Sequence, residues 1–309
     1  MTDDKTLLTQ MLKSIDIEQF SEDIAHVEIH GNKVLGLKLV KGLKVESESF
    51  EDGINVKIIV EKDAHIKNPV RFCFGMIPEN GIQKIIINTI LEENSSASFI
   101  ATCTFPNAKN IQHLMDANIT LKENSFLNYF ERHIHGPEGG VTIVPKTMVF
   151  LNKNSRFNTE FELIKGSAGI IDLDYEAYLD EDAVVSMTTR IFGRTKDDIK
   201  IKEKAHLKGD KSVGVLTSHI ALKDESKAEI INELIADGSY SRGHVDCKEI
   251  IQGSAKAKAI PIVTVNNKLA HITHEAAIGS VDSKQLETLL CRGLTEDEAT
   301  DLIIDGLLK

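Results

Sequence analysis

Apolar residues recur at helical spacing near the start of the chain, between Thr6 and Phe20. Residues three and four positions apart share one face of a helix, so this spacing predicts a short amphipathic helix. The apolar face is formed by Leu7, Leu8, Met11, Leu12 and Ile15.

The pattern changes between His26 and Ile278, where short runs rich in Val, Ile, Thr and Phe alternate with clusters of Asn, Asp, Gly and Ser. Such runs, bounded by turn-forming residues, are typical of strands. A motif also repeats here: an apolar residue, two mostly polar residues, often Asn or Asp, a usually small residue, and then a strand. Copies begin at Val60, Leu91, Leu121, Leu151, Leu179 and Leu207, at steps of 31, 30, 30, 28 and 28 residues, with looser copies at Leu222, Ile251 and Val265.

A step near 29 residues with a half-step near 15 predicts coils that each contain two similar strand-and-turn halves. One such unit cannot bury its apolar face alone, whereas stacked units build a continuous core. We therefore predict a right-handed parallel β-helix. A large antiparallel sandwich is the alternative, because its strands also recur at short spacing, but the steadiness of the step favours the β-helix.

Two short helices are predicted at the end of the chain. Asp282 or Ser283 can cap a helix that ends before Gly293, and Thr295 to Glu298 has the form of a capping box that opens a second helix. The chain then divides into an N-terminal helical segment (1–24), a β-helix core (25–280) and a C-terminal helical hairpin (281–309). Such a hairpin can cover the end of a solenoid or dock a partner.

Charge and cysteine content narrow the function classes. The 309 residues carry a formal net charge of -11, and an acidic surface repels phosphate backbones, so no nucleic-acid partner is expected. No apolar run approaches the roughly 20 residues that cross a bilayer, and no signal peptide is evident, so no membrane partner is expected. The four cysteines lie far apart, unlike those of a secreted disulfide scaffold, which predicts a cytoplasmic protein with free thiols.

The residues that could carry chemistry gather between Gly243 and Gly279. Cys247 and His274 are 27 residues apart, close to one coil, and positions one coil apart lie on strands about 4.8 Å apart. Thiolate, imidazole and the carboxylate of Glu275 form a ligand set for iron, zinc or a nascent cluster. A neighbouring imidazolium would also lower the pKa of the Cys247 thiol. A small, buried Cys247 with surface histidines is the other interpretation, and residue types alone do not decide between them.

A second candidate is the strand segment that holds Glu131, His133 and His135, which share one face. Its H-x-H pair is like the cupin metal motif, but the flanking residues of that motif are missing. We therefore expect a polar or structural role on an exposed strand. Cys73 and Cys103 lie among apolar or small residues and are expected to be core thiols.

Other sites are disfavoured by spacing. A zinc site that adds His244 and His271 to Cys247 and His274 departs from the defined zinc motifs, because its ligands are mixed and its gap is long. The sequence contains no phosphate-binding loop of the nucleotide-binding families and no hydrolase nucleophile elbow.

Four stretches stand out towards the end of the chain: Arg242–Cys247, the less specific Ala259–Pro261, Thr273–Gly279, and the tail from Gln285 through Ala299. They resemble the core of the SufB/SufD family, which builds iron–sulfur clusters. The dense match runs from about Ser241 to Leu308, and only the repeating strand texture is shared upstream. The long N-terminal region of bacterial SufB is absent, so the chain is similar to the compact members found in archaea.

The resemblance implies a parallel β-helix that pairs with a second SufB/SufD-type subunit and assembles clusters at the interface. It also implies a non-enzymatic scaffold whose C-terminal helices dock the ATPase SufC. By this resemblance Cys247 receives persulfide sulfur, and Cys247, His274 and Glu275 hold a transient [2Fe–2S] or [4Fe–4S] cluster. Ile272 and Glu275 stand where SufD-type chains carry Cys and Gly, so the site is SufB-like. Expected anchors for the ATPase are Leu286, Leu290, Leu302 and Ile303.

Two other functions stay open from the sequence: a SufD-like structural partner without its own cluster, and a mononuclear metal-binding β-helix. The sequence does not identify the sulfur and iron donors, the cluster type, the recipient proteins or the residues of the family's internal sulfur tunnel. It also leaves open whether the partner subunit is identical or a paralogue.

Overall fold

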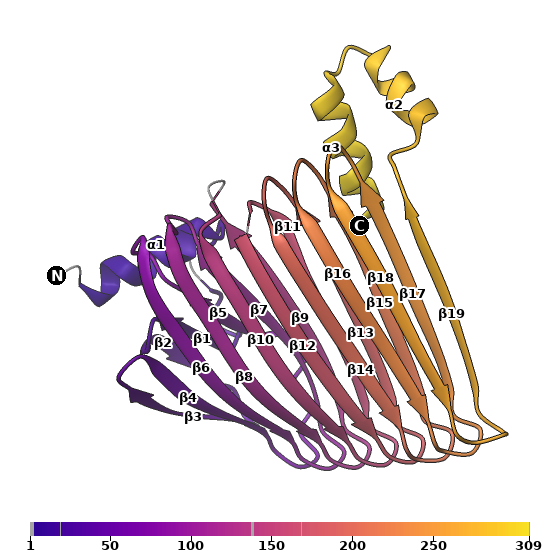
Figure 1. Cartoon of the computed structure of the whole chain (residues 1–309). Coiled ribbons are helices and arrows are strands. Elements are labelled where there is room, and N and C mark those ends of the chain that lie inside the picture. The colour runs from indigo at the N-terminus through magenta and orange to yellow at the C-terminus, as the bar shows by residue number, and fades with distance from the viewer. Residues whose placement is uncertain (1–2, 19, 137–138, 168, 309) are drawn as a thin grey trace.

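The computed structural model describes residues 3–18, 20–136, 139–167 and 169–308. Strands alternate between two facing sheets to give a β-solenoid of about eight turns (Figure 1). The predicted parallel β-helix is thus confirmed; within the described residues, antiparallel pairing is confined to β1 with β2 and β3 with β4. The first sheet holds, in spatial order, β2 (Lys33–Lys38), β1 (His26–His30), β5 (Val70–Gly75), β7 (Ser96–Phe105), β9 (Phe126–His135), β11 (Arg156–Lys165), β13 (Val184–Gly193), β15 (Val213–Leu222), β17 (Arg242–Ile251) and β19 (His271–Gly279). The second holds β3 (Leu43–Phe50), β4 (Gly53–Val60), β6 (Asn80–Leu91), β8 (Asn110–Leu121), β10 (Val141–Leu151), β12 (Gly169–Leu179), β14 (Asp198–Leu207), β16 (Lys227–Ala236) and β18 (Lys256–Val265).

The repeated apolar position of the motif forms one continuous ladder inside the solenoid. Successive copies are direct register partners on neighbouring strands of the second sheet, and all of them are buried. The ladder runs through Val60, Leu91, Leu121, Leu151, Leu179 and Leu207. Because strand residues alternate between faces, every second residue adds to this core and the others face solvent.

The Asn and Asp positions of the motif are explained by backbone geometry. Asp63, Asn94, Asn124 and Asn154 all have φ near +57°, the left-handed region that these residues tolerate. Their side chains also stack: the Nδ2 atoms of Asn94, Asn124 and Asn154 each donate to the side chain one coil earlier, at 2.8, 3.0 and 2.7 Å. The same residues therefore form the turn and join neighbouring coils.

The two ends of the solenoid differ. At the N-terminal end, α1 (Asp4–Ser14) buries Met11 and Leu12, and Asp3 caps it. This helix ends before the predicted Phe20, because Asp16 adopts a positive φ. At the other end, the outer edges of β18 and β19 have no partner strand within the described residues.

The C-terminal hairpin consists of α2 (Ser283–Leu290) and α3 (Glu296–Leu307), which project beyond the sheets near β17 and β19 (Figure 1). Asp282 caps α2, and Thr295 with Glu298 forms the predicted capping box of α3. A small apolar cluster fixes α3 to the solenoid; its buried members are Phe192, Ala221, Val281, Ile303, Ile304 and Leu308. None of the helices in the described residues is both long and apolar enough to span a bilayer. The division of the chain at residues 24 and 280 stays a prediction.

Candidate functional site at the C-terminal end of the solenoid

Cys247 lies on β17, the second-to-last strand of the first sheet. Alternation along the strand directs Val245, Cys247 and Glu249 inward, and all three are buried. The Nδ2 atom of Asn232, from the facing strand β16, lies 3.5 Å from the Cys247 sulfur and 2.8 Å from the hydroxyl oxygen of Ser218. Ser218 is the register partner of Cys247 on β15. The sulfur is therefore held inside the solenoid by an amide donor from the opposite sheet.

Burial raises the pKa of the Cys247 thiol to about 12, and the negative charge of Glu249 adds to the increase. The expectation that an imidazolium lowers this pKa is therefore wrong for the single chain. The physical reason is that burial disfavours the charged thiolate, and the inward neighbour two residues along the strand is a carboxyl group and not a histidine.

Glu249 is a site residue that the sequence reasoning missed. It is 2% exposed, and neither carboxylate oxygen has a hydrogen-bond partner in the described part of the chain. Burial and the neighbouring charge of Asp246 raise its pKa to about 7. The available signal was its spacing of two from Cys247, which places both side chains on one face.

His274 lies on β19, the last strand of the first sheet, and faces the same side as Cys247. The register partner of Cys247 is Ala276, and that of His274 is Val245. From a strand spacing of about 4.8 Å and a rise of about 3.3 Å per residue, the Cα atoms of Cys247 and His274 are roughly 8 Å apart. His274 is exposed although it faces inward, because no further coil covers β19.

Glu275 lies on the opposite face of β19 from His274. The register partner of Glu275 is the outward-facing Asp246. A hydrogen bond to Asp246 and the negative charge of Asp246 raise the pKa of Lys248, and the negative charge of Glu275 raises it further. Within the described residues, Cys247, His274 and Glu275 do not bring their ligand atoms within 4.8 Å of one another. The chain thus places two of the three predicted ligands on one face and the third on the other.

The mixed zinc site that would include His244 is not assembled either. The Nδ1 atom of His244 lies 2.7 Å from the hydroxyl oxygen of Thr273, on the outer face of β17 and β19. Cys247 faces the interior, so the two side chains cannot share one ion.

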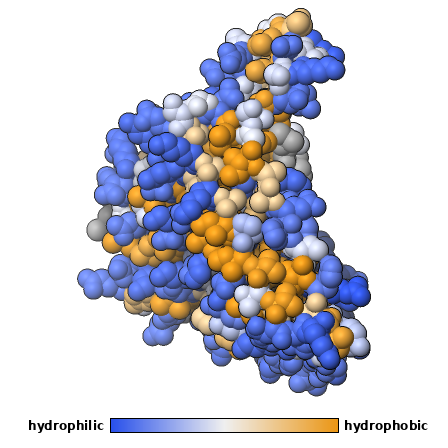
Figure 2. All heavy atoms as spheres, turned by 45° about the vertical axis from the view of Figure 1, so that its right-hand side comes forward, coloured by the Kyte–Doolittle hydropathy of each residue, from blue (hydrophilic) through white to orange (hydrophobic). Residues whose placement is uncertain are grey.

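The uncovered end of the solenoid carries apolar side chains. Figure 2, which brings this end forward, shows a hydrophobic patch running down it. Large apolar residues here are exposed on β18, β19 and the connection between them: Ile262, Val265, Leu269 and Ile278.

The helical hairpin offers a groove of about 630 Å³ that is lined by α2 and α3 residues, among them Gln285 and Leu302. Of the four predicted anchors, Leu290 and Leu302 are exposed and Leu286 is half-buried. Ile303 is only 8% exposed, because it packs in the cluster that fixes α3 to the solenoid. Ile303 also lines the groove, and its role as an anchor stays a prediction.

Comparison with known proteins identifies the family of the chain. Residues 79–307 match the family model described as SUF system FeS cluster assembly, SufBD core domain. The chain belongs to the SufBD family. Iron–sulfur cluster assembly SufBD family proteins of Methanocaldococcus jannaschii and Pyrococcus horikoshii are each 37% identical to it. These alignments cover 93% of this chain and 92% of the first relative, and 96% of this chain and 90% of the second.

A more distant relative is the iron–sulfur cluster assembly protein SufB of Bacillus subtilis. It is 24% identical over 82% of this chain, which spans 54% of that protein. Membership of the SufBD family supports a role in iron–sulfur cluster assembly and implies the Suf system.

The second candidate site, with Glu131, His133 and His135, was expected on an exposed strand. In the structure these three side chains point into the solenoid. Their exposed fractions are 1%, 1% and 6%, so an exposed strand is wrong. Cys73 and Cys103 are buried, as predicted. His113 from β8, which the sequence reasoning did not select, lies beside His133.

The thiol chemistry of Cys247 gives a testable prediction. Because only the thiolate reacts and its pKa is about 12, alkylation of Cys247 in the isolated chain should be slow near neutral pH. Glu249→Gln removes a nearby negative charge and should lower that pKa. Above the Glu249 pKa of about 7, alkylation should therefore quicken by up to about tenfold per pKa unit of change.

Below that pH Glu249 is protonated, and the two proteins should react alike. Peptide-resolved mass spectrometry over a pH series measures the rates, with the exposed Cys291 as an internal reference. Equal Cys247 rates in the two proteins at every pH would show that Glu249 does not act on the thiol.

Proposed function

We propose that the chain is a scaffold subunit on which iron–sulfur clusters are assembled, with Cys247 as the acceptor of sulfane sulfur and His274 as a cluster ligand. The observation that carries the proposal is the shared face of Cys247 and His274 at the uncovered end of the solenoid. A thiol and an imidazole on one face suit iron and sulfide. The protein acts as a non-enzymatic scaffold, and the cluster is its cargo.

Glu249 fits the role of a group that tunes the thiol. When its carboxyl group, whose pKa is about 7, is protonated, the negative charge that raises the pKa of the Cys247 thiol is removed, and the thiolate forms more readily. The Cys247 thiolate then attacks the outer sulfur of a donor persulfide, which forms a persulfide on Cys247 and releases the donor as a thiolate. Glu275, on the other face, is free to serve a ligand set that includes a second subunit.

A second SufB/SufD-type subunit follows from counting ligands. An iron–sulfur cluster takes about four protein ligands, and Cys247 and His274, the two predicted ligands on the inward face, fall short of that number. The unpaired edges of β18 and β19 and their exposed apolar residues favour pairing at this end, where two sites would meet.

The C-terminal hairpin fits the docking of a SufC-type ATPase. Leu290 and Leu302 are exposed on its two helices, and Leu302 lines the groove between them. Leu308, which follows α3, lines a cavity of about 250 Å³ together with Glu249 and Ala277. If nucleotide binding to the ATPase moves α3, Leu308 moves with it and changes the cavity that adjoins Glu249, close to Cys247.

A SufD-like structural partner is the second candidate. The high pKa of the Cys247 thiol in the single chain favours it, because a protonated thiol is a poor nucleophile. The cluster experiment below separates the two functions.

We expect Cys247→Ala to abolish cluster formation. The purified protein, alone and mixed with a SufB/SufD-type partner, is treated anaerobically with iron and sulfide, and the brown chromophore and bound iron are measured. His274→Ala should reduce the bound cluster, and Cys291→Ala, which removes an exposed thiol at the end of α2, should leave it unchanged. Full cluster content in Cys247→Ala would reject the scaffold function.

The end face should form the subunit interface. Ile278→Asp places a charge on an apolar residue that is 49% exposed, and we expect it to weaken association by about tenfold or more. Leu37→Asp is the matched control, because Leu37 has the same exposure on β2, at the far end of the solenoid. Light scattering over a dilution series measures both, and an unchanged dimer in Ile278→Asp would place the interface elsewhere.

The hairpin should carry the ATPase. Leu302→Asp should remove co-purification with a SufC-type ATPase, because it charges a side chain that is 53% exposed, and it should leave the dimer intact. Ile278→Asp should weaken the dimer and leave co-purification with the ATPase unchanged. A Leu302→Asp protein that keeps the complex would show that the hairpin only covers the solenoid.

A further inference from the structure

A group of metal-ligating side chains lies inside the solenoid, away from the Cys247 site. Cys103 on β7 and His133 on β9 are direct register partners in the first sheet, and His113 reaches the same point from β8 in the second sheet. The sulfur and one ring nitrogen from each histidine lie within 4.8 Å of one another, and all three residues are buried. Three strands of the first sheet separate this group from β17.

The hydrogen bonding of His113 is incomplete. Its side chain is 0% exposed, and neither ring nitrogen has a partner in the described residues. Leaving a buried polar group unpaired destabilises a fold, so an imidazole with both nitrogens unpaired indicates a ligand at this point. Its ring neighbours, Phe105 and His133, lie 5.0 and 5.8 Å away between centroids.

His135 lies next to this group, although the ligand atoms that lie within 4.8 Å of one another do not include one of its ring nitrogens. Nδ1 of His133 and Nε2 of His135 are 3.3 Å apart. Zinc–nitrogen bonds of about 2.0–2.1 Å in a tetrahedron place two ligand nitrogens about 3.3 Å apart, so this pair already has the spacing of two ligands.

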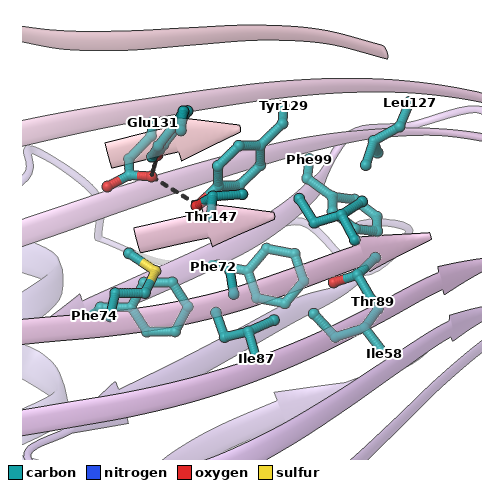
Figure 3. Close-up of a pocket in the computed structure, with 14 residues that line it drawn as sticks. Ile58, Phe72, Phe74, Ile87, Thr89, Phe99, Leu127, Tyr129, Glu131 and Thr147 are labelled. Atoms are coloured by element: carbon teal, nitrogen blue, oxygen red, sulfur yellow. Dashed lines mark hydrogen bonds between the residues drawn. The ribbon is translucent and has the colours of Figure 1, made fainter. Parts of the chain in front are cut away.

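A carboxylate orients His133 from behind. Oε1 of Glu131 lies 2.8 Å from Nε2 of His133, which leaves Nδ1 directed at the cluster. The other oxygen, Oε2, accepts from the hydroxyls of Tyr129 and Tyr175 at 2.9 and 3.4 Å. Figure 3 shows Glu131 and Tyr129 joined in this way at one wall of a small internal cavity. A carboxylate behind a ligating imidazole is the usual support of a zinc–histidine bond.

We infer that Cys103, His113 and His133, with His135 as the fourth ligand, bind one divalent transition-metal ion, for which zinc is the best match. One thiolate and three imidazoles suit zinc, and four protein ligands in a closed interior leave no position for water. The thiol proton of Cys103 is released to solvent as the ion binds. The ion joins the two sheets and so stabilises the fold. The inference is independent of the proposed scaffold function.

The test uses cobalt and zinc on the untagged full chain. Cys247→Ala and Cys291→Ala are introduced first, so that Cys73 and Cys103 are the remaining thiols. The protein is unfolded with a chelator, refolded without metal or with excess Co²⁺ or Zn²⁺, and freed of unbound metal. We expect one ion per chain, the intense visible bands of tetrahedral cobalt, and a near-ultraviolet thiolate-to-cobalt charge-transfer band.

Two matched variants locate the ion. Cys103→Ser should lose the charge-transfer band, whereas Cys73→Ser, a change at an equally buried thiol outside the cluster, should keep it. His113→Gln should lower the bound metal without changing either thiol. Zinc should raise the unfolding temperature of the parent protein and not that of His113→Gln.

The parent protein alone can overturn the inference, whether or not the variants fold. Refolded protein without stoichiometric metal, or with the weak spectrum of water-bound octahedral cobalt, would reject the site. A charge-transfer band that survives Cys103→Ser would also reject it.

Discussion

The parallel ladder that stacks equivalent positions of successive coils is the constraint on which the rest of the structure depends. Each strand bonds to the strand one coil earlier and one coil later, so a position that faces inward in one coil faces inward in the next. The leucine ladder and the asparagine ladder are two results of this rule, one in the core and one at the turns. The same rule holds Cys103 against His133 and places Cys247 and His274 on one face.

Stacking also explains why the candidate site lies at the end. Every inward face except the last is covered by the next coil, and an inward residue on β19 is therefore exposed although its position belongs to the core. A residue such as His274 can then contact a second subunit while it remains beside the buried sulfur of Cys247. The end of the solenoid is thus the place where a buried thiol and an open surface meet.

The sequence alone predicted the architecture, but it predicted only part of the candidate site. The regular step, the turn residues and the capping box predicted the solenoid and the last helix, because each depends on local chemistry. The spacing of Cys247 and His274 predicted that the two residues approach each other. It did not predict the burial of Cys247, which raises the pKa of its thiol. On β9, apolar residues occur on both faces, with Leu127 on one and Phe130 on the other. The alternation of residues along β9 therefore did not show which of its two faces points into the solenoid, or that His133 lies on that face.

His113 and Glu249 are among the inward-facing groups that lack hydrogen-bond partners within the described chain, and their positions give them different roles. His113 lies between coils, where each neighbouring strand is paired on both sides, so a ligand there exchanges only when the fold opens. That situation suits an ion that remains bound and stabilises the protein. Glu249 lies one strand from the open end, where a cavity shared with Leu308 adjoins it. A group in that position can exchange its proton with solvent more readily than one between coils, so the distance from the uncovered coil separates the proposed structural metal site from the proposed assembly site.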